Sequence, residues 1–383
     1  MKKTAFALSA VILFSSLVFN PIEISADNLG ISAQSAVVIE QTTGKILYSK
    51  NENTKRPIAS TTKIMTTLLT LESGNLDEQF TVNSDAIKVE GSSMGLKEGD
   101  IVTKRALCYG MLLPSGNDAA NASAVKLAGS FEKFSFMMNN RAKEIGMTNT
   151  NFVTPSGLDA KNHFSTAYEM ALLTREAMKN PEFCEICCQS NAKVCFGNPP
   201  YDRWLKNSNK LLNNYKGCIG VKTGFTDDAG RCLVSSAEKN GVRLICITLK
   251  APDDWNDHKK MLDYGFSLLK KERLTAPEIQ PEISLAGGFD DTVKIKVGDL
   301  PEVPFVQGDP QKVTSKVLLP QFVYAPVKSG DIVGTIKYFF DGREITDVPI
   351  IAIEVKEANI IEKKPSLFQN AKEKIKELFS KTT

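Results

Sequence analysis

The sequence lacks an excess of charge of either sign. Its 47 Lys and Arg residues stand against 44 Asp and Glu residues, so the formal net charge at pH 7 is only +3. A chain with so little net charge has no overall positive field to attract phosphate groups. This excludes nucleic acid as a partner of the chain as a whole, and any basic site must be local.

Histidine is also scarce. The chain has only two, His163 and His258, and neither accompanies a GxSxG-type serine, which marks one common class of hydrolase. The pattern therefore does not favour a Ser-His-Asp hydrolase. We interpret both side chains as surface or structural imidazoles.

The eight cysteines include one cluster, formed by Cys184, Cys187, Cys188 and Cys195. No histidine and no second CxxC pair completes a familiar zinc spacing, so we expect no metal site. Cysteines of exported proteins often pair as disulfides. Free buried thiols and one or two bridges are both compatible with this sequence, and the pairing stays open.

Residues 1–26 have the composition of a secretory signal peptide. Met1, Lys2 and Lys3 precede an apolar run over 5–19, and small residues lead to an expected cleavage after Ala26. The apolar run is short for a membrane-spanning helix and contains serines. We therefore predict an exported protein, held peripherally at the outer face of the cytoplasmic membrane or in the cell wall space.

Residues 27–272 alternate between strand and helix patterns. β-branched runs on both sides of the turn Thr42-Thr43-Gly44 predict an early hairpin over 35–39 and 45–48. Strand patterns return late, over 218–222, 231–235 and 242–248. Between them apolar residues recur at helical spacing, over 60–71, 104–113, 117–127, 131–145 and 166–178. This order predicts one α/β (α+β) domain whose antiparallel sheet joins early and late segments.

Residues 273–360 have a different composition. Short β-rich runs are separated by Gly, Pro and Asp, over 292–297, 313–319, 332–339 and 348–355. This pattern predicts a small all-β domain. A chain of 383 residues is long enough for two or three domains.

Residues 361–383 form a third kind of segment. Apolar side chains such as Leu367, Phe368 and Ile375 recur at helical spacing, and lysines fall mostly on the remaining face. A basic amphipathic helix of this kind suits a membrane interface with anionic headgroups. We predict a membrane-anchoring helix, and the alternative is a helix packed on its own domain or on a partner.

The segment Ser60-Thr61-Thr62-Lys63 can carry nucleophilic chemistry. In a helix, residues three apart lie on one face, so the hydroxyl and the amine would be neighbours. A serine needs an adjacent base to become a good nucleophile. Lysine can be that base if burial or nearby positive charge keeps it neutral. The alternative is that Ser60 simply caps the helix.

Two further segments have matching chemistry. Ser115-Gly116-Asn117 falls in a break between helical stretches, where the serine can relay a proton and the amide can hold a peptide carbonyl. Lys222-Thr223-Gly224 ends a predicted strand, where a lysine and a hydroxyl can bind a carboxylate and glycine lets a substrate backbone approach. Taken singly, each is also compatible with an ordinary polar loop or strand end.

Together and in this order, the three segments form the SxxK, SxN and KTG set of penicillin-binding proteins and serine β-lactamases. Their surroundings strengthen the likeness: Pro57-Ile58-Ala59, MLLPSGNDAA over 111–120, FVTPSGLD over 152–159 and KTGFTDDAG over 222–230. The chain thus resembles the low-molecular-mass penicillin-binding proteins of the serine-type D-alanyl-D-alanine carboxypeptidase family. The resemblance implies a penicillin-binding/serine β-lactamase-like transpeptidase domain with a C-terminal β domain and a tail.

The resemblance also implies an activity. The enzyme would remove the terminal D-alanine from peptidoglycan pentapeptide stems, and β-lactams would acylate it as inhibitors. Ser60 would attack the peptide carbonyl, Lys63 would take its proton, and Ser115 with Lys222 would deliver a proton to the leaving amine. No cofactor is required.

The remaining roles implied by the resemblance concern binding. Asn117 would orient the substrate, and Thr223 with Lys222 would receive its carboxylate. Gly224 and Phe225 continue the same strand, and the backbone N–H groups of Ser60 and Phe225 would stabilise the oxyanion.

The chain departs from the family pattern at one place. Family members often carry an arginine before their last large helix, and this chain has Asp253-Asp254-Trp255-Asn256 there. The group that replaces this arginine stays open, as do the oligomeric state and a role in growth or in sporulation. D,D-endopeptidase action on crosslinks remains an alternative, and so does β-lactamase action, although no ExxLN-like segment follows Ser115. The intact motifs argue against a catalytically silent binding module.

Overall fold

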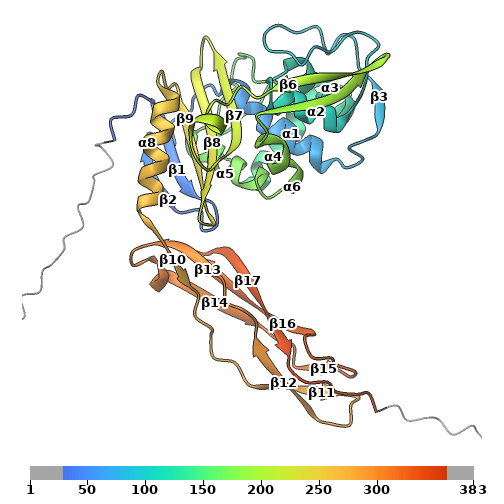
Figure 1. Ribbon diagram of the computed structural model, residues 1–383, viewed down its shortest axis with the longest axis vertical. Helices are drawn as coiled ribbons and strands as arrows, with labels where there is room; N and C mark the ends of the chain where they lie inside the picture. Colours follow the sequence, from blue (N-terminus) through green and yellow to red (C-terminus); the bar gives the residue numbers. More distant parts are fainter. Residues whose placement is uncertain (1–28, 360–383) are drawn as a thin grey trace, which may run out of the picture. The chain divides into compact units, whose positions relative to one another are not determined.

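The computed structural model of the chain describes residues 29–359 (Figure 1). The signal peptide expected over 1–26 and the membrane helix expected over 361–383 lie outside the described residues. Two hydrophobic clusters of the described chain are separate, one built from residues between Val37 and Leu249 and one from residues between Leu274 and Ala352. The predicted fold class is confirmed: a mixed α/β domain is followed by a β domain.

A five-stranded antiparallel sheet organises the first domain, in the order β2-β1-β9-β8-β7. Its strands are β1 (Ser35–Glu40), β2 (Ile46–Lys50), β7 (Cys218–Thr226), β8 (Gly230–Lys239) and β9 (Val242–Leu249). The early hairpin joins the late strands because β1 pairs antiparallel with β9. Early and late segments therefore share one sheet, as the sequence predicts, and β7 lies at its edge.

Both faces of this sheet are covered by helices, which explains the apolar runs along its central strands. Figure 1 shows α8 (Asp254–Ser267) running along one face. On that face, Val38 and Leu244 pack close to Gly265. Their neighbours Val37 and Ile245 belong to the main hydrophobic cluster on the opposite face. Alternate residues of each strand thus enter different layers.

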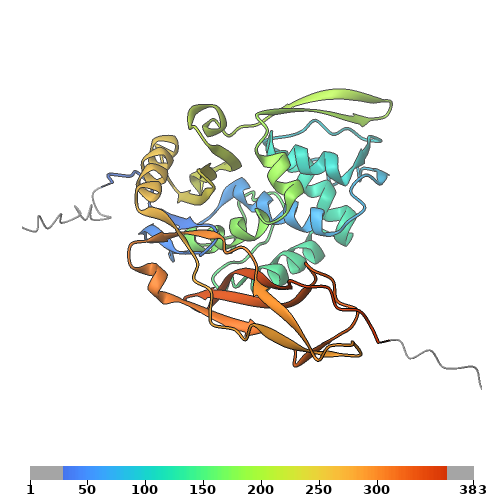
Figure 2. The ribbon, with the colours of Figure 1, turned by 60° about the horizontal axis from the view of Figure 1, so that its bottom comes forward.

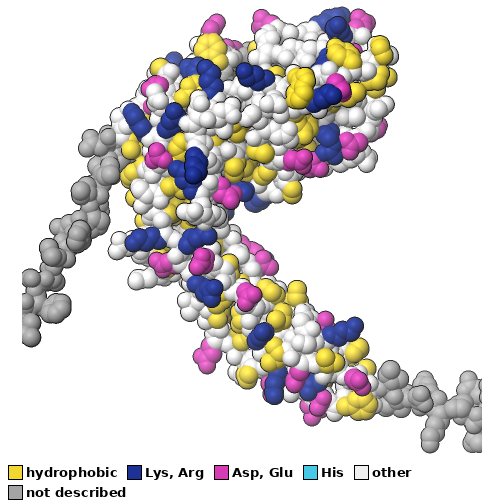
Figure 3. All heavy atoms as spheres, viewed as in Figure 1, with side chains coloured by type: hydrophobic (Ala, Val, Ile, Leu, Met, Phe, Trp, Pro, Cys, Tyr) yellow, Lys and Arg dark blue, Asp and Glu magenta, His cyan; other side chains and the backbone are white. Residues whose placement is uncertain are grey.

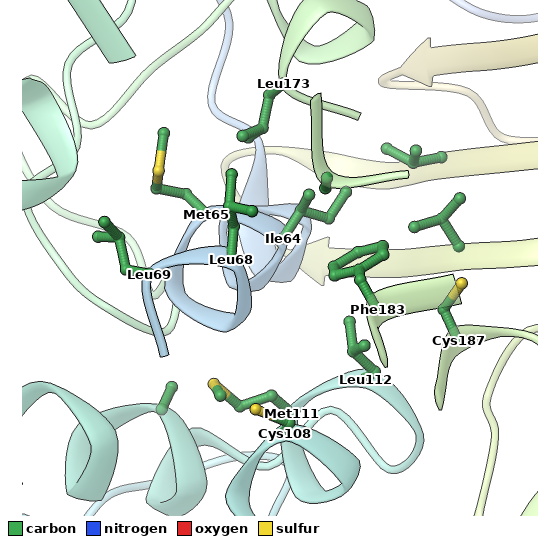
Figure 4. Packing of buried hydrophobic residues seen from close by; sticks show 14 of the residues in the cluster. Ile64, Met65, Leu68, Leu69, Cys108, Met111, Leu112, Leu173, Phe183 and Cys187 are labelled. Atoms are coloured by element: carbon green, nitrogen blue, oxygen red, sulfur yellow. The ribbon is translucent and has the colours of Figure 1, made fainter. Parts of the chain in front are cut away.

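The opposite face is covered by a group of helices around α1, as Figure 2 shows from a second direction. The helices are α1 (Lys63–Glu72), α2 (Lys104–Leu112), α3 (Asn117–Ala128), α4 (Phe131–Ile145), α5 (Ala167–Ala177) and α6 (Pro181–Cys187). Figure 4 shows that α1 is central, because Ile64, Met65 and Leu68 are surrounded by side chains from other helices. This packing fixes the helix that carries Lys63.

Several short elements complete the domain: η2 (Ala59–Thr62), β3 (Gln79–Thr81), β4 (Ile101–Thr103), β5 (Asn191–Gly197), β6 (Pro200–Lys206) and α7 (Leu211–Asn214). The elements expected from the sequence do not include the β5–β6 hairpin. Its second strand is mostly solvent-exposed, and Trp204 is 70% exposed. The first strand does alternate, because Ala192, Val194 and Phe196 pack on the main hydrophobic cluster between more exposed neighbours. The expected elements simply left this stretch out.

The C-terminal domain is all β. Its main sheet has the order β14-β16-β17-β12-β11-β15, and a two-stranded sheet pairs β10 with β13. The elements are β10 (Leu269–Arg273), β11 (Glu282–Ala286), β12 (Thr292–Val297), β13 (Glu302–Val306), η3 (Asp309–Lys312), β14 (Val313–Leu318), β15 (Phe322–Tyr324), β16 (Ile332–Phe340) and β17 (Arg343–Ala352). The boundary expected between 272 and 273 falls inside β10. Basic and acidic side chains are interspersed over the face in Figure 3.

Candidate active site

Ser60 lies in a tight turn that precedes the helix of Lys63. The sequence predicts one helix over 60–71, but Ala59–Thr62 form a 3₁₀ turn and the α-helix begins at Lys63. Ala59 adopts φ +48°, an uncommon conformation for a residue with a Cβ atom. The side chain of Ser60 does not cap the helix, because Oγ contacts the amine of Lys63 instead.

Lys63 is fully buried, and its Nζ atom has three oxygen neighbours. It lies 2.8 Å from Ser60 Oγ, 2.7 Å from Asn117 Oδ1 and 2.8 Å from the backbone oxygen of Ser156. Close packing brings that carbonyl near, because Gly157 has φ +83° and a Cβ atom on it would lie 1.9 Å from the oxygen of Ala59. Three segments distant in sequence therefore meet at one amine.

The electrostatic setting holds the pKa of Lys63 well below its ordinary value of 10.5. Burial is the main cause, because it removes water from the charged form. The positive charge of Lys222 acts in the same direction, and the carboxylate of Asp118 opposes it. Burial also lowers the pKa of Lys222, to about 7. The site therefore favours a neutral amine beside the serine hydroxyl.

Asn117 is the first residue of α3 and holds Lys63 in place. While Oδ1 accepts a hydrogen bond from the lysine, Nδ2 donates one to the backbone oxygen of Glu90 at 2.7 Å. The neighbouring loop is fixed by Asp118, whose buried carboxylate accepts hydrogen bonds from the N–H groups of residues 94–96 and from Ser93 Oγ. The amide predicted to orient substrate therefore also positions the lysine.

Ser115 lies in the loop between α2 and α3 and borders the same cleft as Ser60. Its φ angle is +67°, although serine carries a Cβ atom. Residues in this region of backbone conformation persist where the surrounding structure requires them, which is common at functional sites. Ser115 is thus held at the cleft by a constrained loop.

Strand β7 carries the KTG segment along the edge of the sheet. Lys222 is 1% exposed and donates a hydrogen bond to the backbone oxygen of Thr223 at 2.8 Å. Gly224 lies against the 3₁₀ turn: a Cβ atom added to it would lie 3.1 Å from the backbone N of both Ser60 and Thr61. Phe225 follows and is 63% exposed. Glycine at 224 lets the edge strand approach the serine backbone.

A cleft of about 440 Å³ opens at this point. Most of the predicted site residues line it, and Lys63 and Lys222 lie buried beside it. The lining residues are Ser60, Gly91, Ser92, Ser115, Asn117, Leu158, Ser208, Lys210, Thr223, Gly224, Phe225, Thr226, Arg231, Asp254 and Trp255. No motif contains Arg231, and Asp254 and Trp255 stand out only as part of the segment that lacks the family's arginine. The sequence gives no sign that Arg231 and Asp254, 23 residues apart, would meet.

The two histidines are structural. His163 Nδ1 accepts hydrogen bonds from the backbone N–H groups of Val153 and Thr154, so Nε2 carries the proton and donates it to Thr62 Oγ1 at 2.8 Å. His258 lies between Ser235 and Thr248 under the sheet. Neither contacts Ser60 by a hydrogen bond within the described residues.

All eight cysteines lie within 29–359, and each is a free thiol there. Burial raises the pKa of Cys187 and Cys246 well above the ordinary value. Such thiols are poor nucleophiles.

A mixed α/β domain that brings a serine, a buried lysine of lowered pKa and an edge strand to one cleft is typical of the penicillin-binding class of serine enzymes. Comparison with known proteins agrees. Residues 22–253 match the family described as D-alanyl-D-alanine carboxypeptidase, and residues 275–357 match the penicillin-binding protein 5 C-terminal domain. The chain therefore belongs to the D-alanyl-D-alanine carboxypeptidase family.

Individual relatives extend over most of the chain. The D-alanyl-D-alanine carboxypeptidase DacF of Bacillus subtilis is 33% identical over 345 residues, which cover 86% of this chain and 87% of the relative. A D-alanyl-D-alanine endopeptidase of Pseudomonas aeruginosa is 34% identical over 222 residues, covering 57% of this chain and 71% of that protein. The crystal structure of penicillin-binding protein 5 from Haemophilus influenzae has a TM-score of 0.62 at 27% identity, covering 85% of this chain and 98% of that one.

The protein is thus a serine-type D-Ala-D-Ala carboxypeptidase, a peptidase of the hydrolase class. Its family acts on peptidoglycan stem peptides at the cell envelope and is a target of β-lactams. The endopeptidase relative fits the alternative function, which the family match does not favour. Within residues 29–359, the structure contains no helix of the length and apolarity needed to cross a membrane.

Proposed function

We propose that the enzyme works through an acyl intermediate on Ser60, with Lys63 as the base. The observation that carries this proposal is the set of three oxygen atoms around Lys63 Nζ, at 2.7–2.8 Å. Two of them, Asn117 Oδ1 and the carbonyl of Ser156, can only accept hydrogen bonds. A neutral amine donates its two N–H groups to these oxygens, so its lone pair is directed at Ser60 Oγ.

Acylation then follows from this arrangement. Ser60 Oγ attacks the carbonyl carbon of the penultimate D-alanine as its proton passes to Lys63. The bond to the nitrogen of the terminal D-alanine breaks, and Ser115 with Lys222 delivers the proton that this amine needs to leave. Water later attacks the ester, releases the shortened peptide and restores the Ser60 hydroxyl. A β-lactam enters by the same attack, but its ring-opened acyl group stays bound.

Binding uses the edge strand. Because β7 ends the sheet, its outer backbone groups can pair with an extended peptide as an added strand. The backbone N–H groups of Ser60 and Phe225 stabilise the oxyanion of the tetrahedral intermediate. Asn117 orients the peptide, and Thr223 with Lys222 receives its terminal carboxylate. The close approach of Gly224 to Ser60 supports this assignment.

Intact-protein mass spectrometry after penicillin treatment tests the nucleophile. The wild-type protein should gain the mass of one penicillin, and the adduct should map to the peptide containing Ser60. Ser60→Ala should gain none, whereas Ser208→Ala, which alters another serine of the same cleft, should still be labelled. An adduct that persists in Ser60→Ala would contradict the proposal.

We also propose that the protein is exported and bound to the outer face of the membrane through residues 361–383. The support is the sequence pattern of residues 1–26 and the basic amphipathic pattern of the last segment. Deleting 361–383 should abolish flotation with vesicles containing anionic lipid and leave D-alanine release unchanged. A truncated protein that still floats with these vesicles would overturn the anchoring role.

A further inference from the structure

The cleft beside Ser60 contains a cation that none of the three motifs includes. Arg231 is the second residue of β8 and pairs directly with Phe225 of β7. Opposite residues of an antiparallel pair point to the same face, and so does the residue two positions before Phe225, which is Thr223. Arg231 and Thr223 therefore share the face of β7 and β8 that borders the cleft.

The guanidinium of Arg231 is held by a buried carboxylate. Its Nε and Nη2 atoms donate hydrogen bonds to Oδ1 of Asp254, at 3.1 and 2.7 Å. The side chain of Asp254, the first residue of α8, is only 3% exposed, whereas that of Arg231 is 42% exposed. The ring of Trp255 lies 5.6 Å from the guanidinium carbon. The end of a helix thus fixes one edge of the guanidinium.

The other edge of this guanidinium is directed away from its partner. Arginine offers five N–H donors in a planar fork, and the edge formed by Nη1 and Nη2 matches the two oxygens of a carboxylate. The pair of bonds to Asp254 uses Nε and one N–H of Nη2, and within residues 29–359 no hydrogen bond occupies the outer edge. Arg231 also lines the cleft directly, whereas Lys222 is 1% exposed and its amine is bonded to the backbone of Thr223.

We propose that Arg231, positioned by Asp254, binds the terminal carboxylate of the substrate together with Thr223 and is its direct cationic contact, whereas the buried Lys222 contributes positive charge. The inference rests on the proposed function, because a peptide acylating Ser60 by loss of its last residue carries a free carboxylate one residue beyond the scissile bond. The segment 253–256 contains no arginine of its own. Its contribution is instead a carboxylate that holds an arginine of the neighbouring strand. The same fork receives the carboxylate of penicillin.

Two matched ligand pairs test the proposal. One pair is a peptide ending in D-Ala-D-Ala and the same peptide ending in D-alaninamide; the other is benzylpenicillin and its methyl ester. Arg231→Ala should lower kcat/KM for the free-acid peptide about 10- to 100-fold, the size expected for a charge-assisted bidentate contact. It should lower the rate of acylation by benzylpenicillin by a similar factor. The kcat/KM for the peptide amide and the acylation rate for the methyl ester should stay within about 2-fold of wild type.

Three further variants sharpen the test. We define the free-acid preference as the ratio of the rate for the free acid to that for its amide or ester. Arg231→Lys should recover only part of this preference, because an ammonium is a point charge without the fork. Asp254→Asn, which keeps the oxygen but not the charge, should lower the preference less than Arg231→Ala. The control is Arg243→Ala, because Arg243 makes the same two-bond contact with Glu238 on the same sheet but lies outside the cleft lining. Arg243→Ala should leave kcat/KM for both peptides and the acylation rate for benzylpenicillin and its ester at the wild-type values.

The proposal is overturned if Arg231→Ala slows both members of a pair equally or leaves the free-acid preference intact. It is also overturned if Lys210→Ala, at the other cation of the cleft lining, removes the preference instead. Failure of the proposed function would look different. Wild-type protein would then release no D-alanine and would carry no penicillin on Ser60.

Discussion

At the scale of single residues, the chemistry depends on keeping one buried amine neutral. The desolvation cost of burying Lys63 is offset by the hydrogen bonds that its N–H groups donate to Asn117 Oδ1 and to the Ser156 carbonyl. Lys222 adds a second positive charge nearby, which further disfavours protonation. Each of these contacts can be removed separately.

The pH dependence of acylation should report the neutral lysine. Because burial and Lys222 lower the pKa of Lys63, its base form is present far below pH 10.5, and the acylation rate should fall only when acid protonates the amine. The rate of penicillin labelling, measured between pH 5 and pH 11 at intervals of about half a pH unit, checks this. A rate that rises only towards pH 10.5 would show an ordinary lysine.

Replacing the base should remove most of the activity. Lys63→Arg keeps a positive charge that cannot be neutralised, so acylation should slow by about 10²- to 10⁴-fold. Lys88→Arg, at a lysine whose side chain is 67% exposed, is the matched control and should behave as wild type. Stopped-flow or mass-spectrometric labelling measures both. A Lys63→Arg enzyme with normal acylation would exclude lysine as the base.

The buried histidines make stability sensitive to acid. Burial lowers the pKa of His258 to about 3 and that of His163 to about 4, both from 6.5. Below pH 6.5 the unfolded chain therefore binds protons that the folded protein does not, so their contribution to stability is complete above that pH and declines as the pH falls. The free energy of unfolding should fall by up to about 1.4 kcal/mol per pH unit for each histidine.

Urea unfolding at a series of pH values measures this decline. His258→Gln, which can keep one of the two hydrogen bonds to Ser235 and Thr248, should give a shallower dependence than wild type. Identical slopes in the two proteins would mean that burial does not lower the pKa of His258 in the folded protein.

At the scale of elements, the active site depends on how closely the edge strand β7 approaches the turn η2. Glycine at 224 lets the two approach this closely, because a Cβ atom there would crowd the backbone of Ser60 and Thr61. The turn also has polar support, because Thr62 Oγ1 is hydrogen-bonded to His163. Strand, turn and helix α1 therefore set the position of Ser60 jointly.

Gly224→Ala should impair acylation more than it impairs folding. The new methyl group would lie 3.1 Å from two backbone nitrogens, so β7 must shift away from η2 by a few tenths of an ångström or more. A displacement approaching 1 Å at a reacting group can cost about 10²-fold in rate. We expect at least a 10-fold slower penicillin acylation, on the order set by such displacements, with a thermal midpoint within a few degrees of wild type. Unchanged acylation would show that the close approach is not needed.

At the scale of the whole molecule, the two domains have separate cores. The main hydrophobic cluster of the first domain contains no residue beyond Leu249. The hydrophobic cluster of the C-terminal domain contains none before Leu274. The helix α8 lies between these limits in sequence and covers β8 and β9. The residues proposed for catalysis all belong to the first domain.

A fragment of residues 29–268 should fold and be acylated by penicillin, because it keeps the main hydrophobic cluster and α8. It omits β10, whose pairing partner β13 belongs to the C-terminal domain. A fragment of residues 29–252, which lacks α8, is the matched negative control and should not fold. Circular dichroism and mass-spectrometric labelling measure the two properties. Loss of labelling in the longer fragment would show that the catalytic domain needs the β domain for stability.

The sequence alone determined the elements whose signals are local. The helix over 131–145 matches the structure because its apolar spacing is complete, its N-cap is Ser130 and its C-cap is Gly146 in the left-handed region. The three motifs and their order likewise sufficed to indicate the enzyme family. Each of these signals lies within one stretch of chain.

Only the tertiary structure decided which distant groups share an environment. The lowered pKa of Lys63 comes from burial and from Lys222, and the guanidinium of Arg231 is fixed by a carboxylate on another element. Such effects depend on distances through space, because desolvation and Coulomb interactions sum over all neighbours. A motif names the groups that can react, whereas the packing of helices against the sheet determines their charge and orientation.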